Sequence, residues 1–211
     1  MAVVDHLVLA AADLDAGAAW LEGRLGVRLA AGGRHVRMGT HNRLLRLGER
    51  LYLELIAIDP EAAAPGRPRW FALDRLPLAR GDRPRLIHWV ARSTDIYGDA
   101  AACTEPLGEI LDMERGGYRW RITVPDDGHL PGAGLVPSLI QWDVPIHPAA
   151  SLADAGCALM KLEAYHPQPA SIRGALDSLG LGRQLDVHAA DDGEALLVAY
   201  LRTPLGLVEL D

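Results

Sequence analysis

An internal repeat constrains the fold of this chain more than any other feature of its sequence. His6 and Gly26 recur as His88 and Gly108, each displaced by the same 82 residues. In both copies an apolar run opens the unit, and an aspartate and an Ala-rich stretch lie between the two repeated positions. A fainter third copy begins near Met160 and lacks the histidine. Such self-similarity indicates related structural units that pack on one another.

Each copy predicts the same order of elements. The apolar, β-rich run is typical of a buried strand, and the Ala-rich stretch after Asp13 or Asp95 is typical of a helix capped by an aspartate side chain. Three shorter strand-like runs complete each unit. We therefore expect an α+β fold of repeated βαβββ modules with a degenerate third one. The expected modules and the Pro-, Arg- and Gly-rich linker are, in chain order, residues 1–58, 59–84 (linker), 85–146 and 155–211.

Polar side chains recur on the first and fourth strands of the first two modules. Period-2 alternation places Tyr52 and Glu54 on one face of an otherwise apolar fourth strand. A carboxylate there is costly to bury unless it is paired, hydrogen-bonded or bound to a metal. His6 and His88 lie on the two first strands, and Gln141 is expected to correspond to Glu54. If the two modules pair by a pseudo-twofold axis, these side chains point into one cavity.

The residue types in this group suit a divalent metal. Two imidazoles, a carboxylate and an amide oxygen can bind Zn²⁺, Ni²⁺, Fe²⁺ or Mn²⁺, and two histidines with one carboxylate are also the ligands of non-haem iron oxygenases. The sequence thus predicts a metal site at His6, Glu54, His88 and Gln141. An alternative stays open, because a strand histidine is often a satisfied core residue and an arginine could neutralise Glu54.

A second group of polar residues follows two adjacent glycines. The glycines permit a tight turn and a close approach of the backbone to a ligand. His35, His41 and Asn42 offer hydrogen-bonding groups near the expected mouth of the cavity, and with Tyr52 they are the expected substrate-binding residues. The alternative is a Gly-rich hairpin with solvated polar residues, in which Asn42 holds a loop.

The other histidines form no helical ligand pair. We expect them at the surface, in loops or at strand ends: His129, His147, His166 and His188. Strand alternation directs Trp89 and Trp142 away from His88 and Gln141, so these indoles are expected to pack under the helices rather than on a substrate.

These motifs resemble the vicinal oxygen chelate superfamily, which includes glyoxalase I, the extradiol dioxygenases and the fosfomycin and bleomycin resistance proteins. The resemblance covers roughly residues 3–145 and rests on a βαβββ repeat with a histidine on strand one and a glutamate on strand four. The segments 32–35, 39–45, 52–55 and 136–142 look more narrowly like the glyoxalase-like domain proteins of that superfamily.

The resemblance implies paired modules that form a curved, cup-shaped mixed sheet with helices outside and ligands at first- and fourth-strand positions. It implies a divalent-metal-dependent enzyme, of isomerase, lyase or dioxygenase type, that acts on a small oxygen-bearing substrate. The alternative is a metal-free protein that binds or sequesters a small molecule, as the bleomycin resistance proteins do. Gln141 departs from the family pattern, which has a glutamate there, and an amide cannot accept a proton as a carboxylate does. Glyoxalase-type chemistry would therefore require Glu54 to act as both metal ligand and catalytic base.

Composition excludes several other classes. The net charge of −7 opposes a nucleic-acid partner, and no apolar run approaches the roughly 20 residues that span a membrane. No GxGxxG or Walker A pattern occurs, so a nucleotide cofactor is not expected. The start of the chain does not resemble a signal peptide, and a cytoplasmic protein is expected. Modules of this kind often pair between chains, so a homodimer is among the expected assemblies.

Overall fold

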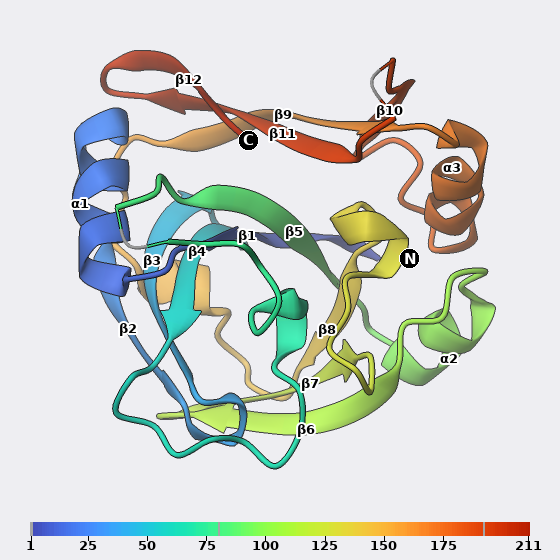
Figure 1. Ribbon diagram of the computed structural model, residues 1–211, viewed down its shortest axis with the longest axis horizontal. Coiled ribbons are helices and arrows are strands. Elements are labelled where there is room, and N and C mark those ends of the chain that lie inside the picture. The colour runs from blue at the N-terminus through green and yellow to red at the C-terminus, as the bar shows by residue number, and fades with distance from the viewer. Residues whose placement is uncertain (1, 80, 192) are drawn as a thin grey trace.

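Two β-sheets lie one above the other in the computed structural model, which describes residues 2–79, 81–191 and 193–211 (Figure 1). Residue 80 of the expected linker lies outside these ranges. The α-helices and β-strands, in chain order, are β1 Val3–Ala10, α1 Leu14–Leu25, β2 Ala30–His35, β3 Thr40–Gly48, β4 Leu51–Ile58, β5 Arg85–Arg92, α2 Ile96–Ala102, β6 Glu109–Arg115, β7 Tyr118–Val124, β8 Ser138–Trp142, β9 Ala158–His166, α3 Pro169–Ser178, β10 Asp186–Ala189, β11 Leu196–Thr203 and β12 Gly206–Leu210.

The first eight strands form one curled sheet in the order β2-β3-β4-β1-β5-β8-β7-β6. β1 and β5 pair antiparallel at its centre, and each pairs in parallel with the fourth strand of its own module. The strand order therefore reads the same from either edge, as a pseudo-twofold axis between the modules requires. The expected α+β class and cup-shaped sheet of paired modules are confirmed.

The last four strands form a separate sheet in the order β10-β9-β11-β12. This third module keeps the order of elements, but its opening strand pairs with the second and third strands instead of the fourth. Its apolar face, which includes Leu162 and Leu197, joins Leu7 and Leu53 of the large sheet in one core. The small sheet thus covers one face of the large sheet and leaves the concave face for a cavity.

Helix capping follows the sequence prediction. Asp13 accepts hydrogen bonds from the backbone N–H groups of Asp15 and Ala16, both at 3.0 Å, and Gly26 ends α1 with a φ of 71°. The positive φ favours glycine at the end of a helix. Asp95 caps α2 by accepting one hydrogen bond, from the backbone N–H of Gly98 at 3.1 Å.

Alternate residues of the central strands separate two apolar clusters. Leu7 and Leu53 belong to the cluster under the small sheet, whereas Val8, Ile56 and Ile140 belong to the cluster on the concave face. The period-2 pattern of the sequence therefore places the even-numbered residues of β1 and β4 toward the concave side. No helix in the described ranges is long and apolar enough to cross a membrane.

Candidate functional site

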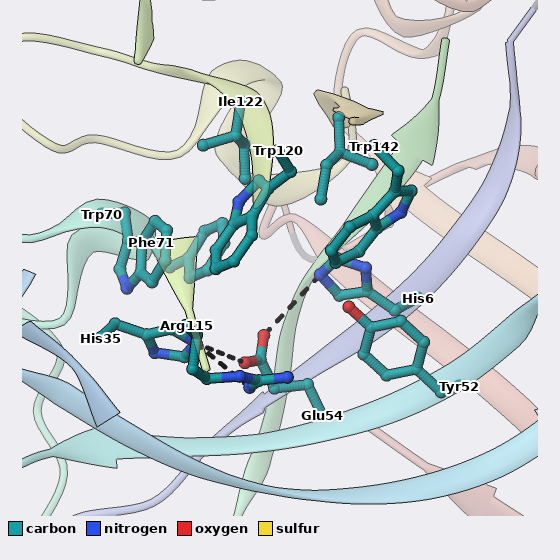
Figure 2. A pocket seen from close by; sticks show the side chains of 11 residues that line it. His6, His35, Tyr52, Glu54, Trp70, Phe71, Arg115, Trp120, Ile122 and Trp142 are labelled. Atoms are coloured by element: carbon teal, nitrogen blue, oxygen red, sulfur yellow. Dashed lines mark hydrogen bonds and ion pairs between the residues drawn. The ribbon is translucent and has the colours of Figure 1, made fainter. Parts of the chain in front are cut away.

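A cavity lies on the concave face of the large sheet (Figure 2). Both modules and the segment between them contribute side chains. The lining residues are His6, His35, Tyr52, Glu54, Trp70, Phe71, Arg115, Trp120, Ile122, Ile140 and Trp142.

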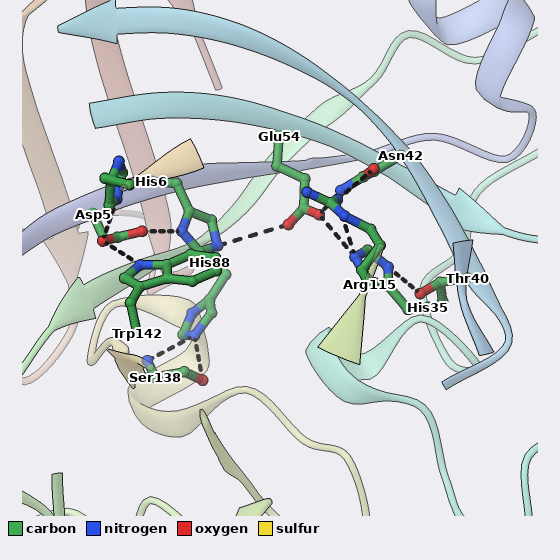
Figure 3. A network of polar contacts seen from close by, with 11 residues as sticks. Asp5, His6, His35, Thr40, Asn42, Glu54, His88, Arg115, Ser138 and Trp142 are labelled. Atoms are coloured by element: carbon green, nitrogen blue, oxygen red, sulfur yellow. Dashed lines mark hydrogen bonds and ion pairs between the residues drawn. The ribbon is translucent and has the colours of Figure 1, made fainter. Parts of the chain in front are cut away.

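Glu54 places its carboxylate among three polar side chains, of which His35 lies farthest, with its Nε2 atom 3.9 Å from Oε1. The Asn42 amide Nδ2 donates a hydrogen bond to Oε1 of Glu54, and Nε2 of His6 lies 3.7 Å from Oε2 (Figure 3). Glu54 is only 5% exposed. The sequence placed Glu54 on the inward face of β4 with Tyr52, and both line the cavity.

His6 is oriented by a buried carboxylate beside it. Its Nδ1 hydrogen-bonds to Oδ1 of Asp5 at 2.8 Å, so its other ring nitrogen faces Glu54. The Tyr52 ring stacks on the imidazole, with the ring centroids 4.5 Å apart and the planes inclined by 15°. These contacts fix both the tautomer and the rotation of the ring.

Asp5 is fully buried and accepts hydrogen bonds from three further side chains. Its Oδ2 accepts from His147 Nε2 at 2.9 Å, from Arg92 NH1 at 3.0 Å and from Trp142 Nε1 at 3.1 Å. Burial alone would raise the pKa of Asp5, but hydrogen bonds from His147 and His6 lower it well below its usual range. Asp5 is therefore an ionised carboxylate that holds together β1, β5, β8 and the segment after β8.

Asn42 links Glu54 to an arginine of the second module. Its Oδ1 accepts hydrogen bonds from Arg115 NH1 at 2.8 Å and from the backbone N–H of Gly33 at 2.9 Å. Arg115 NH1 also lies 3.3 Å from Nε2 of His35. Burial and the Arg115 guanidinium lower the pKa of His35 well below its usual value, so this ring stays neutral and accepts at Nε2.

The two adjacent glycines make room for these side chains. A Cβ at Gly32 would lie 1.9 Å from Oδ1 of Asn42, and a Cβ at Gly33 would lie 2.8 Å from Cδ of Arg115. The close approach that the sequence indicated thus brings protein groups together at the cavity. His41, the next residue before Asn42 on β3, is half-buried, does not line this cavity and borders a separate surface hollow.

His88 lies on the concave side, but its ring nitrogens are bonded within the protein. Nδ1 donates to the carbonyl of Gly134 at 3.0 Å, and Nε2 accepts from the backbone N–H of Ser138 at 3.0 Å (Figure 3). The side chain is fully buried, and burial lowers the pKa of His88 to about 4. The expected placement of His88 as a cavity-facing ligand is corrected by these contacts.

Gln141 points away from the cavity. Its Oε1 accepts a hydrogen bond from the backbone N–H of Ile96 at 2.9 Å, at the start of α2. The pairing register explains the difference, because Val90 pairs with Ser138 just as Val8 pairs with Glu54. Ser138 therefore holds the position expected for Gln141. The same alternation turns the indole of Trp142 into the cavity, not under the helices as expected.

The side chains of this site do not fit the four-ligand metal centre that the sequence suggested. His6 and Glu54 supply two donors that face each other, but His88 is engaged elsewhere and Gln141 lies on the other face. Across residues 2–79, 81–191 and 193–211, no group of three or more His, Cys, Asp or Glu side chains is arranged to hold a metal ion.

Comparison with protein families connects this geometry to a known group. The family model described as a glyoxalase-like domain matches residues 4–180, which include both modules around the cavity. The chain belongs to the glyoxalase-like domain family. The expected resemblance to the glyoxalase-like domain proteins is thereby confirmed. No curated protein matches the sequence.

Solved structures resemble this glyoxalase-like chain at low sequence identity. A hypothetical protein from Staphylococcus aureus is 12% identical with a TM-score of 0.58, over 100% of this chain and 86% of its own. A methylmalonyl-CoA epimerase in complex with methylmalonyl-CoA and NH4⁺ is 20% identical with a TM-score of 0.46, over 70% of this chain and 99% of its own. The methylmalonyl-CoA epimerase from Mycobacterium tuberculosis is 21% identical with a TM-score of 0.41, over 66% and 85%.

The segment expected to be only a linker adds two walls to the site of this glyoxalase-like protein. Trp70 and Phe71 line the cavity, and their rings stack with centroids 5.1 Å apart. Phe71 has a φ of 56°, a left-handed conformation that is uncommon for a bulky residue and is often found at functional sites. The sequence signal for this contribution is the pair of adjacent large aromatic residues in a stretch otherwise rich in Pro and Arg.

Sequence reasoning also missed Asp5, Arg115 and His147. His147 was expected at the surface, but its side chain is buried against Asp5. An aspartate directly before the repeated histidine was a usable signal, since carboxylates commonly orient functional imidazoles. Arg115 stands before a two-glycine hairpin turn, and nothing local in the sequence places it opposite Glu54.

Proposed function

We propose that this glyoxalase-like protein is an enzyme that moves a proton on a small substrate containing a carbonyl group, with Glu54 as the base. The observation that carries the proposal is the buried Glu54 carboxylate, held by Asn42 on one oxygen and facing His6 on the other within a cavity with aromatic walls. A buried, positioned carboxylate beside an oriented imidazole is a common arrangement for general acid–base catalysis.

In the proposed step, Glu54 removes a proton from a carbon next to the substrate carbonyl. The electron pair of that C–H bond forms the double bond of an enolate, and the negative charge collects on the oxygen. Protonated Glu54, or solvent after exchange, returns a proton to the same carbon. The step needs no oxidant, and its net result is epimerisation or hydrogen exchange.

His6 and Asp5 would position this base and share its proton. Because Asp5 accepts from Nδ1 of His6, the Nε2 atom is the one that faces Glu54. A proton on Glu54 can therefore pass to Nε2, which restores the carboxylate. Asp5 does not line the cavity, so it acts as a positioning residue.

We propose that residues 1–58 and 85–146, together with Trp70 and Phe71 of the segment between them, form the functional unit, with 155–211 as a separate module behind it. The first segment supplies His6 and Glu54, and the second supplies Arg115, Trp120 and Trp142.

Hydrogen exchange tests the proposed activity directly. Small 2-oxo acids, 2-hydroxy ketones and acyl thioesters are incubated with the protein in D₂O, and loss of the C–H signal next to the carbonyl is followed by proton NMR. We expect catalysed exchange on at least one compound, and Glu54→Gln should slow it by roughly 10²- to 10⁴-fold. Glu163→Gln, which removes a carboxylate of the small sheet, is the control and should keep the wild-type rate.

Two results would contradict the proposal. One is an absence of catalysed exchange on all three compound classes with folded protein. The other is equal exchange by the wild-type protein and Glu54→Gln, which would assign the proton to another group. Thermal melting of each variant shows whether it is folded under the conditions of the exchange measurement.

The metal-dependent form of the expected function finds little support in the donor set. A divalent ion bound to His6 and Glu54 would supply Lewis-acid chemistry, but among the described residues no third His, Cys, Asp or Glu is arranged with them to hold it. We expect the exchange rate after treatment with EDTA to equal the rate of untreated protein. Loss of activity in EDTA that Zn²⁺, Ni²⁺, Fe²⁺ or Mn²⁺ restores would reverse this conclusion.

A metal-free binding protein is the second candidate, and Ser138 favours it. Ser138 occupies the position in the second module that corresponds to Glu54 in the first, and its side chain is a hydroxyl. The cavity therefore contains one carboxylate instead of a pair. Under this alternative a small molecule would raise the melting temperature in the presence of EDTA, and no compound would undergo exchange.

A further inference from the structure

Arg115 lines the cavity without a carboxylate partner. It ends β6, directly before the turn into β7. Arg34 and Arg92, by contrast, each form an ion pair with an aspartate, whereas in the described part of the chain Arg115 forms none. Its NH1 group contacts only neutral atoms, Oδ1 of Asn42 at 2.8 Å and Nε2 of His35 at 3.3 Å. A partly buried positive charge is therefore available to a ligand.

The donors of Arg115 that remain match a carboxylate. A guanidinium carries five N–H donors in a rigid planar fork. NH1 is used by Asn42 and His35, and neither Nε nor NH2 makes a hydrogen bond to any residue that the structure describes. The Nε and NH2 edge of a guanidinium can donate two parallel hydrogen bonds to one carboxylate. The neutral His35 ring supports this cation because it accepts from it and adds no second charge.

The rest of the cavity wall favours a flat, apolar body. Trp70, Phe71, Trp120 and Trp142 present aromatic rings to the cavity (Figure 2). Aromatic walls bind planar groups by stacking and edge contacts. Arg115 is the only arginine or lysine among the lining residues, so its charge would orient a bound anion.

We propose that the cavity binds small carboxylates with a planar unsaturated or aromatic body, and that Arg115 binds the carboxylate. This inference deepens the proposed function, on whose cavity it rests, by naming the class of substrate. Asn42 separates Arg115 from Glu54, so the anionic end of the ligand lies on the guanidinium and its body extends between the aromatic rings and Glu54. Arg115 thus determines the preference of the cavity for anionic over neutral ligands.

Binding of matched pairs of probes tests the charge requirement. Isothermal titration calorimetry compares benzoate with benzamide, and pyruvate with 2,3-butanedione, because each pair has a similar shape and differs in charge. We expect the carboxylate of each pair to bind roughly 10- to 100-fold more tightly, as charge-assisted bidentate hydrogen bonds imply. If neither carboxylate binds more tightly than its neutral partner, including the case of no binding at all, the proposal is wrong.

Three variants assign the effect to Arg115. Arg115→Gln should remove the preference for carboxylates. Gly33→Ala keeps the charge but adds a Cβ 2.8 Å from Cδ of Arg115, so it should weaken carboxylate binding several-fold by displacing the side chain. Arg119→Gln is the matched control, because Arg119 lies on the same hairpin, is exposed and does not line the cavity. Equal loss in Arg119→Gln and Arg115→Gln would point to a general surface potential and overturn the assignment.

Glu54→Gln separates this proposal from the proposed activity. Removal of the Glu54 charge should leave the preference for benzoate over benzamide intact or increase it, because a neighbouring negative charge is lost. Selective carboxylate binding without hydrogen exchange would reject the proposed enzyme activity and retain the carboxylate site. Hydrogen exchange without carboxylate preference would have the opposite meaning.

Discussion

Ser138 occupies in the second module the strand position that Glu54 occupies in the first. Each faces the histidine of its own module, so the neutral pair His88 and Ser138 corresponds to the pair His6 and Glu54. The two halves of the cup thus have the same backbone and different chemistry. A buried neutral pair contributes to stability, whereas a cavity-facing carboxylate is available for a substrate.

The neutral state of His88 predicts that stability falls in mild acid. Its pKa is about 4 in the folded protein and 6.5 ordinarily, so the unfolded chain takes up the proton first as the pH is lowered. The contribution of neutral His88 to the free energy of unfolding is fully present above pH 6.5 and is lost as the pH falls toward 4. The loss is on the order of 3 kcal/mol. Urea denaturation at several values between pH 7 and pH 4 should show this decrease as a slope of the unfolding free energy against pH.

His88→Gln should be less stable at pH 7 and should have a smaller slope than the wild-type protein. Some slope should remain, because the pKa of His35 is also lowered. His129→Gln, which removes an exposed imidazole, is the control and should retain the full slope. Equal slopes in His88→Gln and the wild-type protein would show that His88 does not titrate as proposed.

Substitution of Gln141 should lower the stability of the protein and leave its activity unchanged. Gln141→Ala removes the acceptor for the Ile96 N–H at the start of α2 and should cost about 1 kcal/mol of unfolding free energy. The rate of hydrogen exchange should stay within about twofold of wild type. Gln168→Ala is the control, because this glutamine precedes α3 but its side chain does not cap it. A large loss of exchange in Gln141→Ala would return this residue to the site.

The repeat and the alternation of apolar residues predicted the large sheet well, because pairing of the modules follows from local patterns that both copies share. His6, Tyr52 and Glu54 were placed on the concave face for the same reason. The residue that corresponds to Glu54 in the second module could not be found in this way, because the register of β8 depends on the length and turns of the loop before it. An error in the position along a strand by an odd number of residues reverses its faces.

Contacts between distant segments explain the other omissions. Asp5 is stabilised by Arg92, Trp142 and His147, which come from two other strands and a loop. Arg115 reaches Asn42 only because the β6–β7 hairpin closes over the first module. Contacts between residues that are far apart in the chain leave no periodic pattern in the sequence, so a single sequence does not reveal them.

Asp5 predicts the largest loss of stability among these variants. Asp5→Asn leaves four donors around a neutral amide, and loss of a buried ionic partner typically costs about 3–5 kcal/mol. The pKa of Asp5 is lowered in the folded state, so its contribution is present above its ordinary value of 3.8 and is lost as the pH falls below it. Urea denaturation should therefore show a gap between wild type and Asp5→Asn that is wide at pH 6 and narrows at pH 3.

Asp127→Asn is the control for that experiment. Asp127 also hydrogen-bonds to a histidine, His129, but it is exposed, and water screens the interaction. Its substitution should change the stability very little at either pH. A gap for Asp5→Asn that stays constant between pH 6 and pH 3 would show that charge is not the source of the stabilisation.

Two substitutions of Tyr52 distinguish a structural role of its ring from a chemical role of its hydroxyl. Its ring stacks on His6, and burial raises the pKa of Tyr52 well above its usual value, so the hydroxyl stays protonated. Tyr52→Phe keeps the stacking and should leave hydrogen exchange within about threefold of wild type. Tyr52→Leu removes the ring, frees the rotation of His6 and should slow exchange at least tenfold, since misplacement of a catalytic group is costly. A strong loss in Tyr52→Phe would instead make the hydroxyl a proton donor to the substrate.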